Sequence, residues 1–230
     1  MRNRSGGPGR TSSMSAHDSA GADDLERPRI IPYNLLDNLI RDASARFLTG
    51  TCACRKERDC PSFPREPGCL VLGEGSVASG DVREVTVEEA LERTARAREL
   101  MLRARIAYDS SSLAIHESDR RRMLPICFSR TCCCPATTPK REEDNDGWMK
   151  LPELWVHAVG DCSNCEKCAR SCPSRALVMG PDGPIFAPSC QGCGLCAAAC
   201  PRRNLRIGLP AASDAMRFLL SRSGATRTNS

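Results

Sequence analysis

The clearest helical pattern in the chain begins at Thr86, where apolar residues recur at the spacing of one helix face. That face carries Val87, Leu91, Ala95, Leu102 and Ile106. Thr86 and Glu89 have the spacing of a capping box, which favours a helix start at this point. The pattern therefore predicts a helix of about 20 residues, roughly 30 Å long at the standard rise.

Two more segments have helical spacing. Apolar residues recur from Tyr33 onward and predict a helix ending near Gly50, and Ala211 to Ser221 predict a short helix near the end of the chain. Residues 1–27 show no periodicity and are rich in Ser, Gly, Arg and Asp, which predicts a disordered tail. A segment rich in Pro, Lys and acidic residues at 137–150 is typical of a linker.

Half of the 16 cysteines follow an internal repeat. Each run has four cysteines and a closing proline at identical spacing: Cys162-x2-Cys165-x2-Cys168-x3-Cys172-Pro173 and Cys190-x2-Cys193-x2-Cys196-x3-Cys200-Pro201. An iron-sulfur cube needs one thiolate per iron, and ligands at three-residue intervals reach its separate corners. Paired zinc knuckles usually have longer spacers between their Cys-x2-Cys modules. The spacing therefore favours [4Fe-4S] clusters over zinc.

The two runs resemble bacterial two-cluster ferredoxins from about Val156 to Ile207. In that family the fourth cysteine of each run ligates the other cluster. The resemblance implies one cluster on Cys162, Cys165, Cys168 and Cys200, and a second on Cys190, Cys193, Cys196 and Cys172. The likeness extends past the ligands, because the segment Cys172-Pro173-Ser174-Arg175-Ala176-Leu177 corresponds to Cys200-Pro201-Arg202-Arg203-Asn204-Leu205.

The other eight cysteines lie in two distant groups, one early and one late in the preceding half. They are Cys52, Cys54, Cys60, Cys69, Cys127, Cys132, Cys133 and Cys134. Three consecutive cysteines point in different directions and cannot all fill one apolar cavity, which argues for a metal site. A third iron-sulfur cluster, a structural zinc, and reduced or redox-active thiols remain open. Arg55 beside Cys54 could lower a thiolate pKa or hydrogen-bond a cluster sulfide, but an arginine at such a position is more often exposed, and exposure is the expectation here.

The order of these segments along the chain is similar to that in a family of anaerobe iron-sulfur proteins. Members of that family carry a cysteine-rich amino-terminal domain before two [4Fe-4S] motifs. The resemblance spans about Ile31 to Ile207 and rests on the Cys52-Ala53-Cys54-Arg55 segment, the later cysteine cluster and the two ferredoxin runs. This chain has Ser129 and Arg130 where that family carries two further thiols. Chemistry that needs all six thiols of the later cluster is therefore not expected.

Together these observations predict an α+β protein. A helical cysteine-rich domain is expected at 28–136, a small pseudo-symmetric bacterial-ferredoxin-like domain at 151–209, and a helix and tail at 210–230. No apolar run approaches the length of a membrane span, which predicts no membrane insertion. Ferredoxin-type cysteines indicate a reducing compartment, the cytoplasm.

The predicted function is electron transfer with redox partner proteins. The chain has no Gly-x-Gly-x-x-Gly or P-loop motif, which argues against an autonomous nucleotide-dependent oxidoreductase. Alternatives are a ferredoxin-type subunit of a redox enzyme, an enzyme with a substrate-binding cysteine-rich half, and a cluster-based regulator. Eight thiolates and two oxidised cluster cores lower the formal charge of +5 to about +1, which argues against nucleic acid as a partner. The sequence does not define the oligomeric state.

Overall fold

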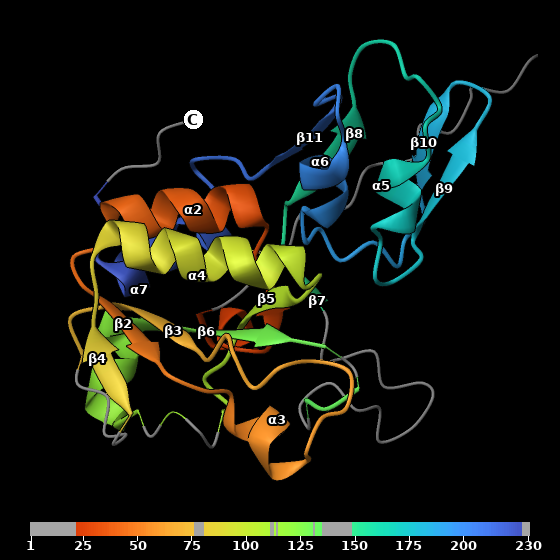
Figure 1. Ribbon diagram of the computed structural model, residues 1–230. Helices are drawn as coiled ribbons and strands as arrows, with labels where there is room; N and C mark the ends of the chain where they lie inside the picture. Colours follow the sequence, from red (N-terminus) through yellow and green to blue (C-terminus); the bar gives the residue numbers. More distant parts are fainter. Residues whose placement is uncertain are drawn as a thin grey trace, which may run out of the picture.

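The computed structural model describes residues 22–75, 81–110, 113, 115–130, 132–134 and 149–226 (Figure 1). Most of the tail expected at 1–27 and most of the linker expected at 137–150 lie outside the described residues. Residues Ala22–Leu25 of the expected tail form the short helix α1.

The amino-terminal half is built on a seven-stranded mixed sheet. Its strand order is β4-β2-β3-β6-β5-β1-β7, antiparallel except for the parallel pair β1 and β7. The strands are β1 (Arg29–Ile30), β2 (Arg46–Thr49), β3 (Leu70–Gly73), β4 (Val82–Glu84), β5 (Arg103–Ile106), β6 (Met123–Ser129) and β7 (Met149–Lys150). The central strands β3, β6 and β5 bring residues from three distant segments side by side.

Helices cover one face of this sheet. In Figure 1, α2, α4 and α7 lie together on one side of the strands, and α3 lies on the other side. The helices of this half and of the carboxyl end are α2 (Tyr33–Asp42), α3 (Ala53–Glu57), α4 (Val87–Glu99), the 3-10 helix η1 (Glu117–Arg122) and α7 (Asp214–Ser223). The last helix therefore packs on the first domain of the chain.

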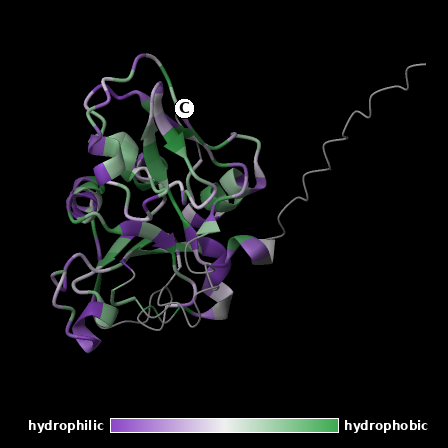
Figure 2. Ribbon diagram, turned by 90° about the vertical axis from the view of Figure 1, so that its right-hand side faces the viewer, coloured by the Kyte–Doolittle hydropathy of each residue, from purple (hydrophilic) through white to green (hydrophobic). Residues whose placement is uncertain are grey.

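Side chains alternate between the two faces of the central strands, as the two-residue period of a strand requires. One set joins the core beneath the helices: Leu70, Leu72, Ala104, Ile106, Leu124 and Ile126. Cys69, Val71 and Met123 belong to a separate cluster, with Cys127 packed against it. Arg103 and Arg105 alternate with Ala104 and Ile106 and therefore share the face opposite the helices. Figure 2 shows bands of hydrophobic and hydrophilic colour along the central strands.

The amino-terminal half is thus α/β, and the prediction of a helical domain is wrong. Its strands are short, and the four residues of β3 are all buried, so they lack the polar alternation that marks a half-exposed strand. Short apolar runs of this kind do not distinguish a strand from a buried helix segment.

The long helix expected from Thr86 ends early, because α4 stops at Glu99 and β5 begins at Arg103. Met101, with a φ of 56°, turns the chain between the two elements. The expected stripe is also shifted: the buried positions of α4 are Ala90, Thr94 and Ala97, and Ala95 is exposed. The predicted capping box is confirmed, since the Thr86 side chain accepts from Glu89 N and the Glu89 carboxylate accepts from Thr86 N.

The other two expected helices are present with different bounds. The first, α2, ends at Asp42, and the residues up to Gly50 form β2 instead. The last, α7, begins at Asp214 with Ser213 as its cap. Among the described residues, none of the helices has the length and apolar content needed to cross a membrane.

Loss of the capping box tests the start of α4. We expect Thr86→Ala to lower the free energy of unfolding by about 1 kcal/mol, because Glu89 N loses its acceptor at the helix start. Denaturant unfolding of the anaerobic holoprotein measures this loss. Glu92→Ala, an exposed position on the same helix, is the matched control and should change stability by about 0.5 kcal/mol or less. Equal losses in the two variants would contradict the capping role.

Candidate metal centres

The carboxyl-terminal part consists of two repeats 28 residues apart, since β8 begins at 155 and β10 at 183. The first repeat contains β8 (Trp155–Ala158), α5 (Lys167–Arg170) and β9 (Leu177–Gly180). The second contains β10 (Gly183–Phe186), α6 (Leu195–Ala199) and β11 (Leu205–Gly208). The strand β8 pairs with β11, and β9 pairs with β10. Each small sheet therefore takes one strand from each repeat.

The cysteine loops of both repeats use left-handed backbone at matching places. Positive φ angles occur at Asn164 and Gly192, at Glu166 and Gly194, and at Arg175 and Arg203. Each pair is 28 residues apart, so the two loops have the same turns despite different residues. At Gly192 a side chain is excluded sterically as well, because a Cβ atom would lie 2.1 Å from Cδ2 of Leu154. The second cysteine loop therefore packs more closely against neighbouring residues than the first loop does.

The first group of thiols combines both repeats. Cys168 is close enough to Cys162 and Cys200 to interact with them electrostatically. Burial is the largest cause of the raised pKa of Cys168. Cys165 is exposed on the same loop, and the Lys167 backbone N–H holds the pKa of its thiol below the usual value. These are the four cysteines expected to hold one cluster.

The second group is its counterpart and lies deeper in the molecule. Cys172, Cys190, Cys193 and Cys196 line one cavity, with Gly192 and Gly194 in its wall. Burial raises the pKa of Cys193 to about 11 and that of Cys196 to about 12. Binding a metal here must therefore displace the thiol protons, which couples occupancy to pH.

Backbone amides point at the sulfur atoms of the first group. Asn164 N lies 3.4 Å from Cys162 Sγ, and Asn204 N lies 3.4 Å from Cys200 Sγ. Each of these hydrogen bonds lies within one repeat, and both sulfur atoms belong to the first group of thiols. N–H groups at this range stabilise thiolate charge and tune the potential of a bound cluster.

The donor set fits iron-sulfur cubes. All eight ligand positions of the two groups are cysteines. Among the described residues, no three of their sulfur atoms lie within 4.8 Å of one another. A single ion would draw its ligands together, whereas a cube places each thiolate on a separate iron. Apolar side chains pack around the cysteines and limit water access: Leu177, Leu205, Met179 and Phe186.

Two repeats with interleaved strands and two groups of four thiols define a dicluster iron-sulfur module. Residues 154–203 match the family model of the 4Fe-4S dicluster domain. This carboxyl-terminal part therefore binds two [4Fe-4S] clusters, as the resemblance to bacterial two-cluster ferredoxins predicts. No curated protein matches the chain.

The second cysteine loop docks on the amino-terminal sheet. Tyr33 N donates to the carbonyl oxygen of Cys193 at 3.3 Å, and the Arg103 guanidinium donates to Gln191 Oε1 at 2.5 Å. Arg103 is only 3% exposed, and burial lowers its pKa to about 10, opposed by Cys193 and Cys172. The amino-terminal domain therefore supplies a buried cation to the second thiol group.

Most of the eight remaining cysteines gather near Arg105 on the sheet face opposite the helices, the side where α3 lies in Figure 1. Six of them line one cavity: Cys52, Cys54, Cys69, Cys127, Cys133 and Cys134. The expectation that two distant segments meet in one site is consistent with this cavity.

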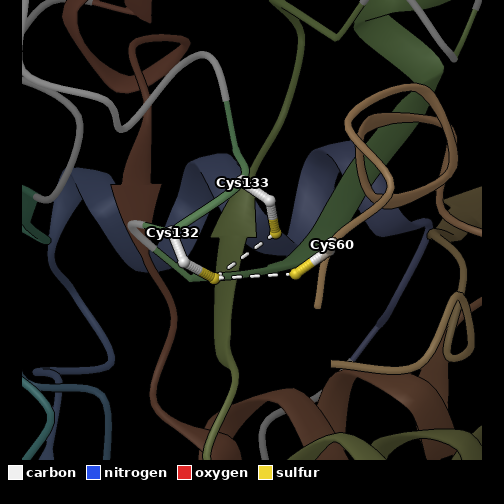
Figure 3. Close-up of side chains that lie close together, drawn as sticks. All are labelled: Cys60, Cys132 and Cys133. Carbon is white, nitrogen blue, oxygen red and sulfur yellow. Dashed lines mark hydrogen bonds between the residues drawn. The ribbon is translucent and has the colours of Figure 1, made fainter. Parts of the chain in front are cut away.

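Three cysteines form a cluster that we call the cysteine triad: Cys60, Cys132 and Cys133, the last of which also lines the cavity. Their sulfur atoms all lie within 4.8 Å of one another. Cys132 Sγ contacts both other sulfur atoms, at 3.9 Å from Cys60 Sγ and 3.5 Å from Cys133 Sγ, and Figure 3 marks both contacts with dashed lines. Cys132 is exposed and Cys133 is buried, so the triad reaches from the surface toward the cavity.

The arginines of both sites are poorly predicted by the sequence. The expectation that Arg55 is exposed is wrong, because its side chain is 2% exposed and donates to the carbonyl oxygens of Phe128 and Pro67. Arg103 and Arg105 fall within the helix of about 20 residues predicted from Thr86, but they lie on β5. The signal that would have found them is their alternation with Ala104 and Ile106, which is a strand period.

Removing the buried cation should change the second cluster selectively. We expect Arg103→Gln to lower the reduction potential of one cluster on the order of tens of millivolts, because a nearby positive charge favours the more negative reduced state. Redox titration followed by EPR measures both clusters in one sample. Arg222→Gln, an equally buried arginine on α7 that pairs with Glu26, is the control and should leave both potentials unchanged. A shift of both clusters by the same amount in Arg103→Gln would contradict a local effect.

Proposed function

We propose that this protein transfers single electrons between redox partner proteins in the cytoplasm, using two clusters with exchanged ligands. One cluster is held by Cys162, Cys165, Cys168 and Cys200, and the other by Cys190, Cys193, Cys196 and Cys172. The observation that carries the ligand assignment is that Cys172 lines one cavity with the three early cysteines of the other repeat. The proximity of Cys168 and Cys200 is the matching support in the other group.

When bound, each cluster accepts and releases one electron at a time. The chain contributes the environment of that exchange. Backbone N–H groups of Asn164 and Asn204 stabilise charge on Cys162 and Cys200, and the apolar wall around Leu177 and Leu205 restricts water.

The two cysteine loops differ in a way that suggests separate roles. Residues 163–167 of the first loop are exposed, including Cys165. The corresponding part of the second loop is covered, with Gly192 and Gly194 buried. We therefore assign electron exchange with a partner protein to the first loop. Electron exchange within the protein is assigned to the second loop.

The two ferredoxin-type cysteine runs support a reducing compartment, because their thiols must stay reduced to bind the clusters. We also propose that the amino-terminal cysteines bind a further metal, since both the cavity and the cysteine triad concentrate thiol ligands.

Matched serine variants test the exchange of ligands. We expect Cys172→Ser and Cys190→Ser to alter the same EPR signal of the reduced protein, and Cys200→Ser to alter the other, because the fourth cysteines cross between repeats. Cys172 and Cys200 occupy the same place in the two runs and control for each other. If Cys172→Ser and Cys168→Ser altered the same signal, the ligand assignment would be wrong.

Stoichiometric reduction of an acceptor tests the carrier function. The anaerobic protein, reduced with dithionite and freed of excess reductant, should reduce at least about two molecules of cytochrome c per chain, one for each cluster. Absorbance of the cytochrome reports the electrons transferred, and a cluster-free chain serves as the control. Bleached clusters that return no electrons to cytochrome c would overturn the proposal.

A further inference from the structure

The cavity on the sheet face opposite the helices has a volume of about 170 Å³ and is lined by the six cysteines named above. We propose that this cavity holds a third [4Fe-4S] cluster. The inference goes beyond the two-cluster function and does not depend on it, because none of the dicluster cysteines lines the cavity.

The thiols of the cavity come from different elements and meet across it. Cys54 at the start of α3 is hydrogen-bonded to Cys52 and to Cys134. Cys69 precedes β3, and its sulfur lies 3.2 Å from that of Cys127 on β6. The seven-stranded sheet and α3 therefore present thiols from at least two directions, as a cluster with several corners requires.

Two buried arginines indicate that the cavity contains negative charge. Arg55 and Arg105 are both 2% exposed and line the cavity. The Nε atom of each is buried and has no hydrogen-bond partner within the described part of the chain. A buried cation is costly unless an anion lies close to it.

The described carboxylates do not fully supply that anion. Arg105 pairs with Asp109 at 2.8 Å, but no described carboxylate lies within ion-pair distance of Arg55. The groups that interact electrostatically with Arg55 are the thiols of Cys52 and Cys69. Four thiolates on an oxidised cube carry a net charge of about −2, which would balance both guanidinium groups.

The size of the cavity favours a cluster over a single zinc ion. Zinc binds four thiolates at about 2.3 Å in a closed tetrahedron, which leaves no space between the sulfur atoms. Here six thiols surround a volume several times the ~30 Å³ that one water occupies. The cysteine triad has sulfur contacts of 3.5 and 3.9 Å, which match thiolates on one ion. A single zinc ion would therefore fit at the triad.

The cavity adjoins the second thiol group of the dicluster module through one strand. Arg103 and Arg105 are two residues apart on the same face of β5, about 6.6 Å at the rise of a strand. Arg103 lies beside Cys193, and Arg105 interacts with Cys127 and Cys134 in the cavity. A cluster in the cavity would therefore lie next to the internal end of the proposed electron path.

The test is metal and sulfide analysis of the full chain purified without oxygen. We expect about twelve irons and twelve acid-labile sulfides per chain, of which about eight belong to the dicluster module. Cys54→Ser should reduce both counts to about eight and leave the two dicluster EPR signals unchanged. Cys132→Ser is the matched control, because it removes a neighbouring thiol that belongs to the triad and does not line the cavity.

Three results would overturn the proposal. One is a wild-type chain with about eight irons and no further sulfide. Another is an additional zinc ion that is lost in Cys54→Ser but kept in Cys132→Ser, because such an ion would occupy the cavity. The third is a Cys69–Cys127 disulfide found by mass spectrometry in the anaerobic protein. The iron and sulfide counts of the wild-type chain test the proposal even if Cys54→Ser does not fold. Absence of the two dicluster EPR signals would be a different result, and it would count against the two-cluster function alone.

Discussion

The carboxyl-terminal module depends on exchange between its two repeats. Neither repeat pairs its own strands: β8 needs β11, and β10 needs β9. The thiols follow the same rule, because Cys172 and Cys200 each lie with the early cysteines of the other repeat. Cluster binding and chain pairing thus stabilise the same arrangement, and metal binding free energy contributes directly to folding. A small module with few large apolar residues can be held together in this way.

The amino-terminal half is stabilised in a different way. Its sheet buries a conventional apolar core beneath α2, α4 and α7, and this leaves the other face available for thiols and arginines. Because β-strand side chains alternate, one short strand such as β5 serves both purposes, with Ala104 and Ile106 in the core and Arg103 and Arg105 on the opposite face. One face of the sheet therefore stabilises the fold, and the other face carries the residues of the site.

The two halves meet where the second cysteine loop docks. Tyr33 and Arg103 contact Cys193 and Gln191, and Gly194 allows close approach, since a Cβ atom there would lie 3.3 Å from Tyr33 N. The first loop remains exposed. This asymmetry gives nearly identical ligand runs different surroundings, and hydrogen bonds, charge and solvent access are the factors that set cluster potentials. These differences between the two loops are consistent with the proposed assignment of separate roles to them.

The sequence alone determined the dicluster module, because cluster ligation requires particular residues at particular spacings and leaves a local pattern. The capping box at Thr86 and Glu89 was predictable for the same reason. The seven-stranded sheet was not, because its short buried strands pair residues far apart in the chain, such as Leu70 with Ile126. Only the tertiary structure revealed that Arg55 and Arg105 are buried among the amino-terminal cysteines, since their burial depends on which segments fold over them.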